Sequence, residues 1–246
     1  MNNKDKIEFI KNWIFNYVKA MPKKAESLVI GISGGIDSSV SSTLSAMTGL
    51  KTIVLSMPIN QKLSQHDLSL KHQEWLLKKF KNVEAHTVNL DQLFDVFKSS
   101  VSNFDNERGM ANSRARLRMI TLYQVAAANK GIVVGTGNKV EDFGVGFYTK
   151  YGDGGVDISP IADCTKTQVW EIASKMSIIE DIIEAQPTDG LWDDGRNDER
   201  QLGLTYKQIE EAMDNKDSKY YEKYMQIRKL NLHKMKPIPI CLFEDD

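Results

Sequence analysis

The chain has 246 residues, of which 41% are hydrophobic and 26% charged, a balance typical of globular proteins and unlike disordered or fibrous ones. Its 32 basic and 33 acidic residues give a formal charge of −1, without the basic excess of proteins that hold DNA or RNA mainly by charge. No apolar run approaches the length of a membrane span, and the N-terminal residues lack the apolar segment of a signal peptide. We therefore expect a cytoplasmic protein with neither a nucleic-acid nor a membrane partner.

The first half of the chain alternates between helical and strand patterns. Residues 1–20 carry Ile7, Ile10, Ile14 and Val18 at the spacing of one helix face, which predicts an amphipathic helix. Strands are then expected at 27–32, 52–56, 83–88 and 132–134, and helices at 38–47, 66–80, 91–101 and 107–129. Lys130 and Gly131 are expected to end the last helix. The alternation predicts an α/β fold: a Rossmann-like doubly wound parallel sheet of about five strands with helices on both faces.

Beyond Gly135 the pattern changes. Segment 137–160 is rich in glycine and segment 187–204 is acidic and aperiodic, whereas 165–177, 205–213 and 219–233 are expected to be helical. Two long loops in a compact domain indicate lids or binding loops, and we expect both to close on ligands. The two cysteines, Cys164 and Cys241, form no CxxC pair, so we expect them to be packing residues.

The first expected strand runs into a turn rich in glycine and serine, and a helix follows. The turn consists of Gly31, Ile32, Ser33, Gly34, Gly35, Ile36, Asp37 and Ser38. Adjacent glycines let the backbone approach an anion closely, and the first amide groups of the helix have no partner within it. Since the helix dipole favours a negative guest at this end, the segment predicts a phosphate-binding loop.

Asp37 is the unusual residue of this loop. A carboxylate beside phosphates is repulsive unless a cation lies between them, so Asp37 indicates Mg²⁺ held by a carboxylate and phosphate oxygens. The alternative is that Asp37 only caps the helix. The loop lacks the lysine of a Walker A motif. SGGIDSS resembles instead the pyrophosphate loop of the ATP pyrophosphatase superfamily, whose members cleave ATP to AMP and pyrophosphate.

Four further segments narrow the resemblance. They are NSRARLRM at 112–119, GTGNKVE at 135–141, FYTKYGDGGVDISP at 147–160, and His233-Lys234. In this order they are similar to the synthetase domain of the NAD synthetase family, over essentially the whole chain. The resemblance implies condensation of deamido-NAD with ammonia, with ATP as co-substrate and Mg²⁺ as cofactor. Because only 26 residues precede the first expected strand, we expect a single synthetase domain over 1–246, no glutaminase domain, and ammonia as the nitrogen donor.

The resemblance also implies roles for matching residues at the ATP site. Loop residues 31–38 would hold the phosphates, Thr136 would contact the nucleotide, and Thr188 would reach the phosphates from the second loop. Asp37 and Glu141 are the implied metal ligands, and Asp37 and Lys166 the implied catalytic residues. Lys166 would neutralise phosphate, and a lysine in the first turn of a helix independently indicates a nearby anion. Without the resemblance, the alternatives are that Glu141 is a solvated loop acid and that Thr136 is an ordinary strand end.

For deamido-NAD, the matching positions are Arg116, Lys150, Asp157, His233 and Lys234. At about 100° per residue, Arg116 leaves the helix face shared by Arg114 and Arg118, although the three could form one solvated basic face. The segment from Glu141 to Tyr148 is one residue longer than in some members. In the family the substrate lies at a two-fold interface, so a homodimer is implied. Trp13, Tyr17, Leu122 and Tyr123 would supply either interface or core.

Three rival interpretations remain. Another ATP pyrophosphatase would adenylate a different carboxylate or carbonyl acceptor, but thiolases of this kind need paired cysteines and glutamine-fed synthetases need a glutaminase domain. A nucleotide sensor without turnover has less need of two metal carboxylates, Asp37 and Glu141. A stress-protein-like or flavodoxin-like binding module would explain the fold but not the segment at 147–160.

Overall fold

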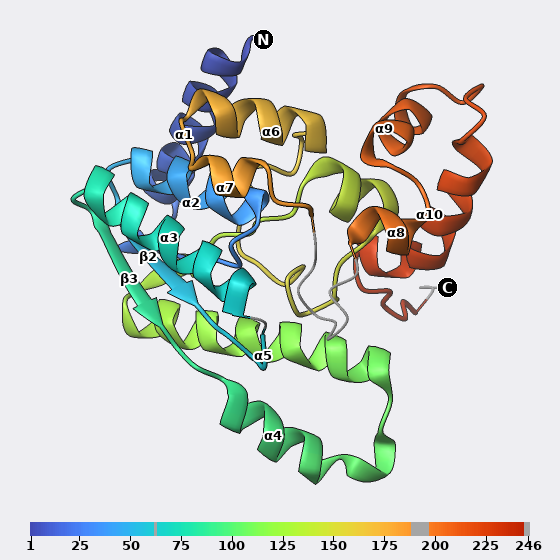
Figure 1. The fold of residues 1–246 in the computed structure, drawn as a ribbon, viewed down its shortest axis with the longest axis horizontal. Helices are drawn as coiled ribbons and strands as arrows, with labels where there is room; N and C mark the ends of the chain where they lie inside the picture. Colours follow the sequence, from blue (N-terminus) through green and yellow to red (C-terminus); the bar gives the residue numbers. More distant parts are fainter. Residues whose placement is uncertain (62, 188–196, 244–246) are drawn as a thin grey trace.

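The computed structural model describes residues 1–61, 63–187 and 197–243. Its centre is a parallel sheet of four strands in the order β3-β2-β1-β4 (Figure 1). The strands are β1 (Ser27–Gly31), β2 (Lys51–Ser56), β3 (Val83–Thr87) and β4 (Gly131–Val133). The chain therefore winds outward from β1 in one direction and returns to place β4 on the other side. This reversal puts the topological switch point, where ligands bind in such sheets, at the carboxyl ends of β1 and β4.

Helices cover both faces of the sheet because side chains of β1 alternate between two cores. Leu28 and Ile30 pack with α1 (Asn3–Ala20), α2 (Ile36–Met47) and α6 (Lys166–Lys175). Val29 points the other way and packs with α4 (Asp91–Ser100) and α5 (Glu107–Ala128). α3 (Leu63–Lys79) completes the first face beside β2 and β3. The predicted doubly wound α/β architecture is confirmed, as is the apolar stripe of the first helix, whose four members are buried.

The described sheet has one strand fewer than expected. Beyond β4, Val134 and Ile158 form a single parallel bridge, so the fifth position is occupied by a contact too short to count as a strand. Two short helices, α7 (Glu180–Ile183) and α8 (Asp198–Leu202), were not predicted. α8 lies within the segment 187–204 that was expected to be aperiodic, and its few residues carry too short a pattern to reveal a helix period.

The end of α5 differs from the expectation at one residue. Lys130, not Gly131, has the left-handed backbone, with φ of 49°. Gly131 instead begins β4, where a Cβ atom would meet Ser27 Oγ at 2.3 Å and the Ser27 carbonyl oxygen at 2.8 Å. The glycine is therefore needed for close strand packing rather than for ending the helix.

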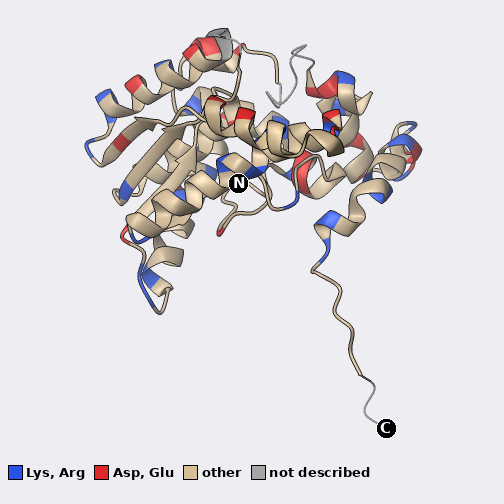
Figure 2. Cartoon of the chain, turned by 90° about the horizontal axis from the view of Figure 1, so that it is seen from below, with Lys and Arg blue, Asp and Glu red and all other residues tan. Residues whose placement is uncertain are grey.

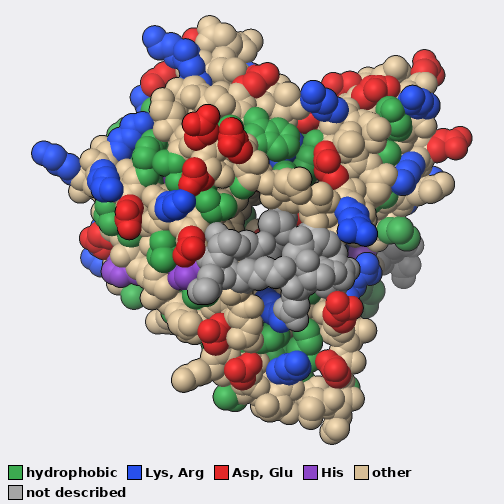
Figure 3. Space-filling view, in the orientation of Figure 1, with side chains coloured by type: hydrophobic (Ala, Val, Ile, Leu, Met, Phe, Trp, Pro, Cys, Tyr) green, Lys and Arg blue, Asp and Glu red, His purple; other side chains and the backbone are tan. Residues whose placement is uncertain are grey.

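The C-terminal helices form a smaller core beside the main one. α8, α9 (Tyr206–Asp214) and α10 (Tyr221–Met235) enclose Val140 and Val145 from the π-helix η2 (Lys139–Val145). After α10 an extended tail with Pro237 and Pro239 leaves the body of the molecule, as Figure 2 shows. Acidic and basic side chains are interspersed on the face drawn in Figure 3, in keeping with the formal charge of −1. Among the described residues, no helix combines the length and apolar character needed to cross a bilayer.

Candidate active site

The predicted phosphate loop connects β1 to α2 at the switch point. Gly34 has φ of 87°, a conformation that favours glycine. The side chains of Ser33 and Ser38 lie 3.1 Å apart at their hydroxyl oxygens, and Ser38 also donates to the Gly35 carbonyl at 2.9 Å. The N-cap of α2 is Gly35, which has no side chain to bond the first amides of the helix. The loop therefore presents unsatisfied amides at a helix N-terminus, the arrangement that binds phosphate.

Three charged side chains converge beside this loop. Lys166 Nζ donates to Asp37 Oδ2 at 2.6 Å and to Glu141 Oε1 at 2.9 Å. Lys166 is almost fully buried, with 2% of its surface exposed, at the start of α6. The first amides of α2 have no side-chain cap, and the Asp37 carboxylate instead accepts from Lys166 and Asn138, so the helix-cap alternative is wrong. The anion that Lys166 was expected to face is here a pair of carboxylates.

Asp37, Glu141 and Lys166 are called the trio below, and their electrostatics favour the charged state of Lys166. Burial alone lowers the pKa of the ammonium, but the charges of Asp37 and Glu141 outweigh it and raise the pKa of Lys166 above its ordinary value. Burial raises the pKa of the Asp37 carboxyl, and Lys166 opposes that shift. Removing Lys166 would therefore leave two carboxylates, 17% and 14% exposed, without a counter-charge.

The side chain of Asn138 links the Asp37 carboxylate to the backbone at Glu141. Its amide donates to Asp37 Oδ1 at 3.1 Å, and its side-chain oxygen accepts from the backbone amides of Val140 and Glu141, each at 3.0 Å. This capping starts the π-helix η2, in which the Gly146 amide bonds five residues back to the Glu141 carbonyl. A π-turn takes up one residue more than an α-turn.

Three of the residues matched to deamido-NAD meet at α5, to which Arg116 belongs, whereas Lys150 and Asp157 lie in the loop that contacts this helix. Arg116 Nε donates to the Lys150 carbonyl at 3.2 Å. Two turns further along, the Tyr123 hydroxyl donates to Asp157 Oδ1 at 3.0 Å, while Asp157 Oδ2 accepts from the Val133 amide at 2.7 Å. Burial and the Asp157 charge raise the pKa of Tyr123 to about 12, so its hydroxyl stays protonated as a donor. The structure brings Arg116, Lys150 and Asp157 together along α5, and among the described residues no hydrogen bond or ion pair joins them to Asp37, Glu141 or Lys166.

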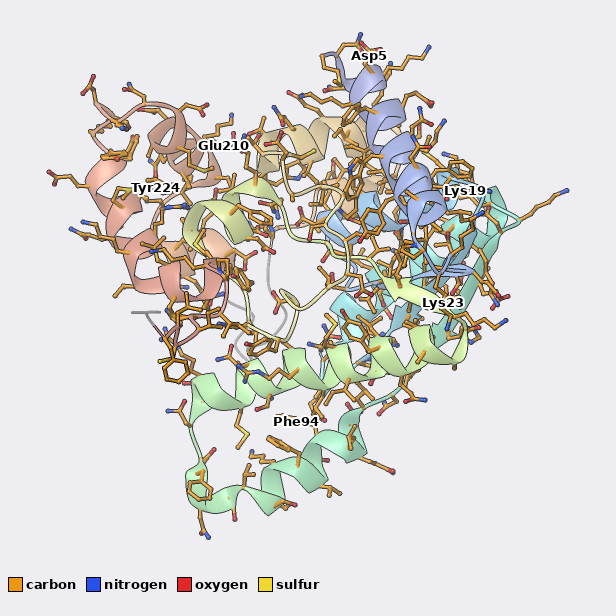
Figure 4. The ribbon with its side chains drawn as sticks, turned by 180° about the vertical axis from the view of Figure 1, so that it is seen from behind. Asp5, Lys19, Lys23, Phe94, Glu210 and Tyr224 are labelled. Carbon is orange, nitrogen blue, oxygen red and sulfur yellow. The ribbon has the colours of Figure 1, made fainter. Side chains whose placement is uncertain are left out.

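The neighbouring arginines of α5 have different surroundings. Arg114 lies 4.7 Å from the ring centre of Phe94, which projects from α4 toward α5 (Figure 4). Arg118 Nε donates to the Met57 carbonyl at 3.0 Å. Both are half-buried, whereas Arg116 is exposed. The predicted divergence of Arg116 is confirmed, and the alternative of a solvated basic face is wrong.

The remaining predicted residues are spread over three places. His233 is exposed on α10, and Lys234 Nζ donates to the carbonyls of Gly146 and Tyr148, the latter at 2.8 Å. Thr136 is half-buried between β4 and Asn138. Thr188 lies outside the described residues, so its place in the site stays a prediction. Cys164 is buried as expected, but Cys241 is exposed on the tail and is not a packing residue.

Sequence reasoning missed two members of the site, Asn138 and Tyr206. Asn138 stood within a segment singled out for the resemblance, and its position after a strand end was an available signal. Tyr206 begins α9 and donates a hydrogen bond to Glu141 Oε1. Nothing local to Tyr206 marked it, because its partner is 65 residues away in the chain.

Comparisons with known proteins identify the family of the chain. The NAD synthase family model matches residues 6–239. The NH3-dependent NAD(+) synthetase of Carboxydothermus hydrogenoformans is 36% identical over 215 residues, covering 85% of each chain. The NMN synthetase of Francisella tularensis is 32% identical with a TM-score of 0.90, over 99% of this chain and all of that one. The NH3-dependent NAD synthetase of Campylobacter jejuni, 24% identical over 98% of this chain and all of the other, shares the fold with a TM-score of 0.79. With the family model spanning nearly the whole sequence, the chain belongs to the NAD synthase family.

Proposed function

We propose that this chain is an ATP-dependent ligase that joins ammonia to the nicotinate carboxylate of deamido-NAD, giving NAD, AMP and pyrophosphate. The observation that carries the proposal is the convergence of Asp37 and Glu141 on one buried cation beside an uncapped helix N-terminus, in a chain of the NAD synthase family. A single domain over 1–246 would use ammonia directly.

The donor set fits Mg²⁺. The described residues hold no group of three or more His, Cys, Asp or Glu side chains that could enclose a metal. Mg²⁺ is bound in nucleotide sites by one or two carboxylates together with substrate phosphates, not by a complete protein cage. Asp37 and Glu141 would be these ligands, since both already converge on a cation, the Lys166 ammonium. When bound, the metal supplies charge neutralisation for the departing pyrophosphate.

The reaction needs positioning more than it needs a protein nucleophile. The nicotinate carboxylate attacks the α-phosphorus of ATP, pyrophosphate leaves, and ammonia attacks the resulting mixed anhydride and expels AMP. The loop amides after Gly34 would hold the β- and γ-phosphates in line with that attack. Lys166, relieved of the two carboxylates, would neutralise phosphate oxygens. Thr136 and Thr188 are proposed to contact the nucleotide as well.

The acceptor is proposed to bind on the exposed face of α5. Arg116 and Lys150 supply positive charge there, and Asp157 supplies an acceptor for a ribose hydroxyl. Trp13, Tyr17 and Tyr123 are each more than a third exposed, so they are available to bury against a second copy, whereas Leu122 belongs to the core. A homodimer would bury these exposed aromatic side chains, and His233 and Lys234 would complete the site from α10.

Arg116→Ala is expected to raise the KM for deamido-NAD at least tenfold while the KM for ATP stays within twofold, because the lost charge contacts only the acceptor. Steady-state kinetics with each substrate varied in turn checks this. Lys98→Ala, which removes an exposed positive charge from the last turn of α4, serves as a control for the loss of charge. A parallel rise in the KM for ATP would place Arg116 at the nucleotide instead.

ATP–pyrophosphate isotope exchange tests the function itself. With deamido-NAD and Mg²⁺ but no ammonia, exchange is expected, and NAD is expected to form once ammonium is added. Exchange with another carboxylic acid and none with deamido-NAD would discard this acceptor. If NAD forms without prior exchange, the function stands and pyrophosphate is retained until ammonia arrives.

A shorter acceptor, nicotinate mononucleotide, is a second candidate. The NMN synthetase of Francisella tularensis has a higher TM-score and identity to this chain than the Campylobacter jejuni NAD synthetase does. Nicotinate mononucleotide carries the same reacting carboxylate without the adenylyl half. We expect kcat/KM to favour deamido-NAD, and a ratio in favour of the mononucleotide would reverse the assignment.

A further inference from the structure

Tyr206 is a buried side chain at the centre of the site that the reaction scheme above does not use. Only 1% of its surface is exposed, and its hydroxyl donates to Glu141 Oε1. A second carboxylate, that of Asp198, lies 3.3 Å from the same hydroxyl. The Lys166 ammonium sits 4.9 Å above the centre of the Tyr206 ring. Tyr206 therefore touches two of the three charged side chains of the trio.

The two contacts of the Glu141 carboxylate fall on one oxygen. Lys166 Nζ and the Tyr206 hydroxyl both bond to Oε1, and within the described part of the chain no hydrogen bond to Oε2 is found. A carboxylate held at one oxygen by a fixed donor keeps its other oxygen in a fixed direction. When Lys166 turns to phosphate, Tyr206 remains as the donor that holds Oε1.

The surroundings of Tyr206 make it a rigid donor. Its backbone amide donates to the Glu199 side chain of α8 at 2.9 Å, and its ring meets Trp170 edge-on at 5.9 Å between centres. The same helix, α9, also fixes the start of α6: Glu210 accepts from the Thr167 amide at 2.9 Å and from its hydroxyl at 2.8 Å. Figure 4 shows Glu210 on the side of α9 that faces α6. α9 thus fixes the positions of both Lys166, through α6, and Glu141, through Tyr206.

We infer that Tyr206 is a positioning residue that holds Oε1 of Glu141 so that Oε2 is presented to the metal, and thereby sets the affinity of the site for Mg²⁺–nucleotide. The inference rests on the proposed function, because Glu141 is a metal ligand only there. The inference goes beyond the proposed function because it assigns a role to a residue of the C-terminal helices that contacts a metal ligand and not the metal. Partners of this kind commonly account for tenfold to hundredfold in metal affinity.

The test measures metal binding without turnover. Mn²⁺ is titrated into the enzyme with a non-hydrolysable ATP analogue, and bound metal is followed by electron paramagnetic resonance and calorimetry. Tyr206→Phe is expected to raise the apparent Kd for Mn²⁺ about tenfold or more. In a Glu141→Gln background the same change is expected to have no further effect, because Tyr206 acts through that carboxylate.

Tyr224→Phe is the matched control. Tyr224 is a buried tyrosine of the same small core, on α10 (Figure 4), and its hydroxyl is bonded to Arg228 instead of Glu141. It is expected to leave the Kd for Mn²⁺ within twofold. Equal Kd values for the two phenylalanine variants, or a lower melting temperature in Tyr206→Phe with unchanged Mn²⁺ binding, would overturn the inference. A wild-type chain that binds no Mn²⁺–nucleotide would instead overturn the proposed function, and the inference with it.

Discussion

Asp37→Asn is expected to lower the rate of adenylation by a factor on the order of 100 or more while nucleotide affinity falls far less. The substitution keeps the shape of the side chain but removes the charge that would ligate the metal. The backbone amides of the loop, with the φ of 87° at Gly34, are untouched and still hold phosphate. Pyrophosphate exchange measures the rate of adenylation, and equilibrium titration with a non-hydrolysable ATP analogue measures nucleotide affinity.

Asp181→Asn provides the control for this substitution. Asp181 pairs with Lys71 on the surface, with more than half of each side chain exposed, and such pairs contribute little. It is expected to behave as wild type in both measurements. Near-normal adenylation in Asp37→Asn would contradict the metal assignment, whereas an equal loss of nucleotide affinity would make Asp37 a determinant of loop structure.

The parts of the site that are local in the chain were predictable from the sequence. The phosphate loop is a continuous segment between a strand and a helix, so its glycines, its helix N-terminus and Asp37 are visible together. The alternation of strands and helices likewise fixes a doubly wound sheet through connection rules that hold across proteins. The charge of Lys166 against the helix dipole indicated an anion nearby, and the structure supplies two.

The parts that depend on distant segments were not predictable. Asn138 and Asp37 are 101 residues apart, and Lys166 and Asp37 are 129 apart. No periodicity or composition relates such pairs, because the contact is created by the order of the strands. Lys166 was expected to face phosphate, and only the packing of α6 against α2 shows that it neutralises carboxylates in this structure.

Lys166→Met is expected to lower the free energy of unfolding by about 3–5 kcal/mol at pH 8, because it leaves Asp37 and Glu141 buried without their cation. The loss is expected to shrink as the pH falls. In the variant the two carboxylates repel each other in a buried site, so their folded-state pKa values rise. A group whose pKa is raised on folding contributes stability below its unfolded pKa, about 4, and that contribution is lost as the pH rises. Chemical denaturation between pH 5 and 8 checks the slope.

Lys139→Met is the control, since Lys139 pairs with the exposed Asp163 at 2.9 Å and is expected to contribute no more than about 1 kcal/mol at any pH.

Added MgCl₂ tests whether the two carboxylates that Lys166 holds also form the metal site. In Lys166→Met it is expected to raise the melting temperature without nucleotide, because the divalent ion replaces the missing charge, whereas in the wild type the Lys166 ammonium already occupies the position between the two carboxylates. A variant as stable as wild type at pH 8 would mean that the carboxylates are solvated or protonated in the ligand-free enzyme. If Mg²⁺ leaves the melting temperature of Lys166→Met unchanged, Asp37 and Glu141 do not form the metal site.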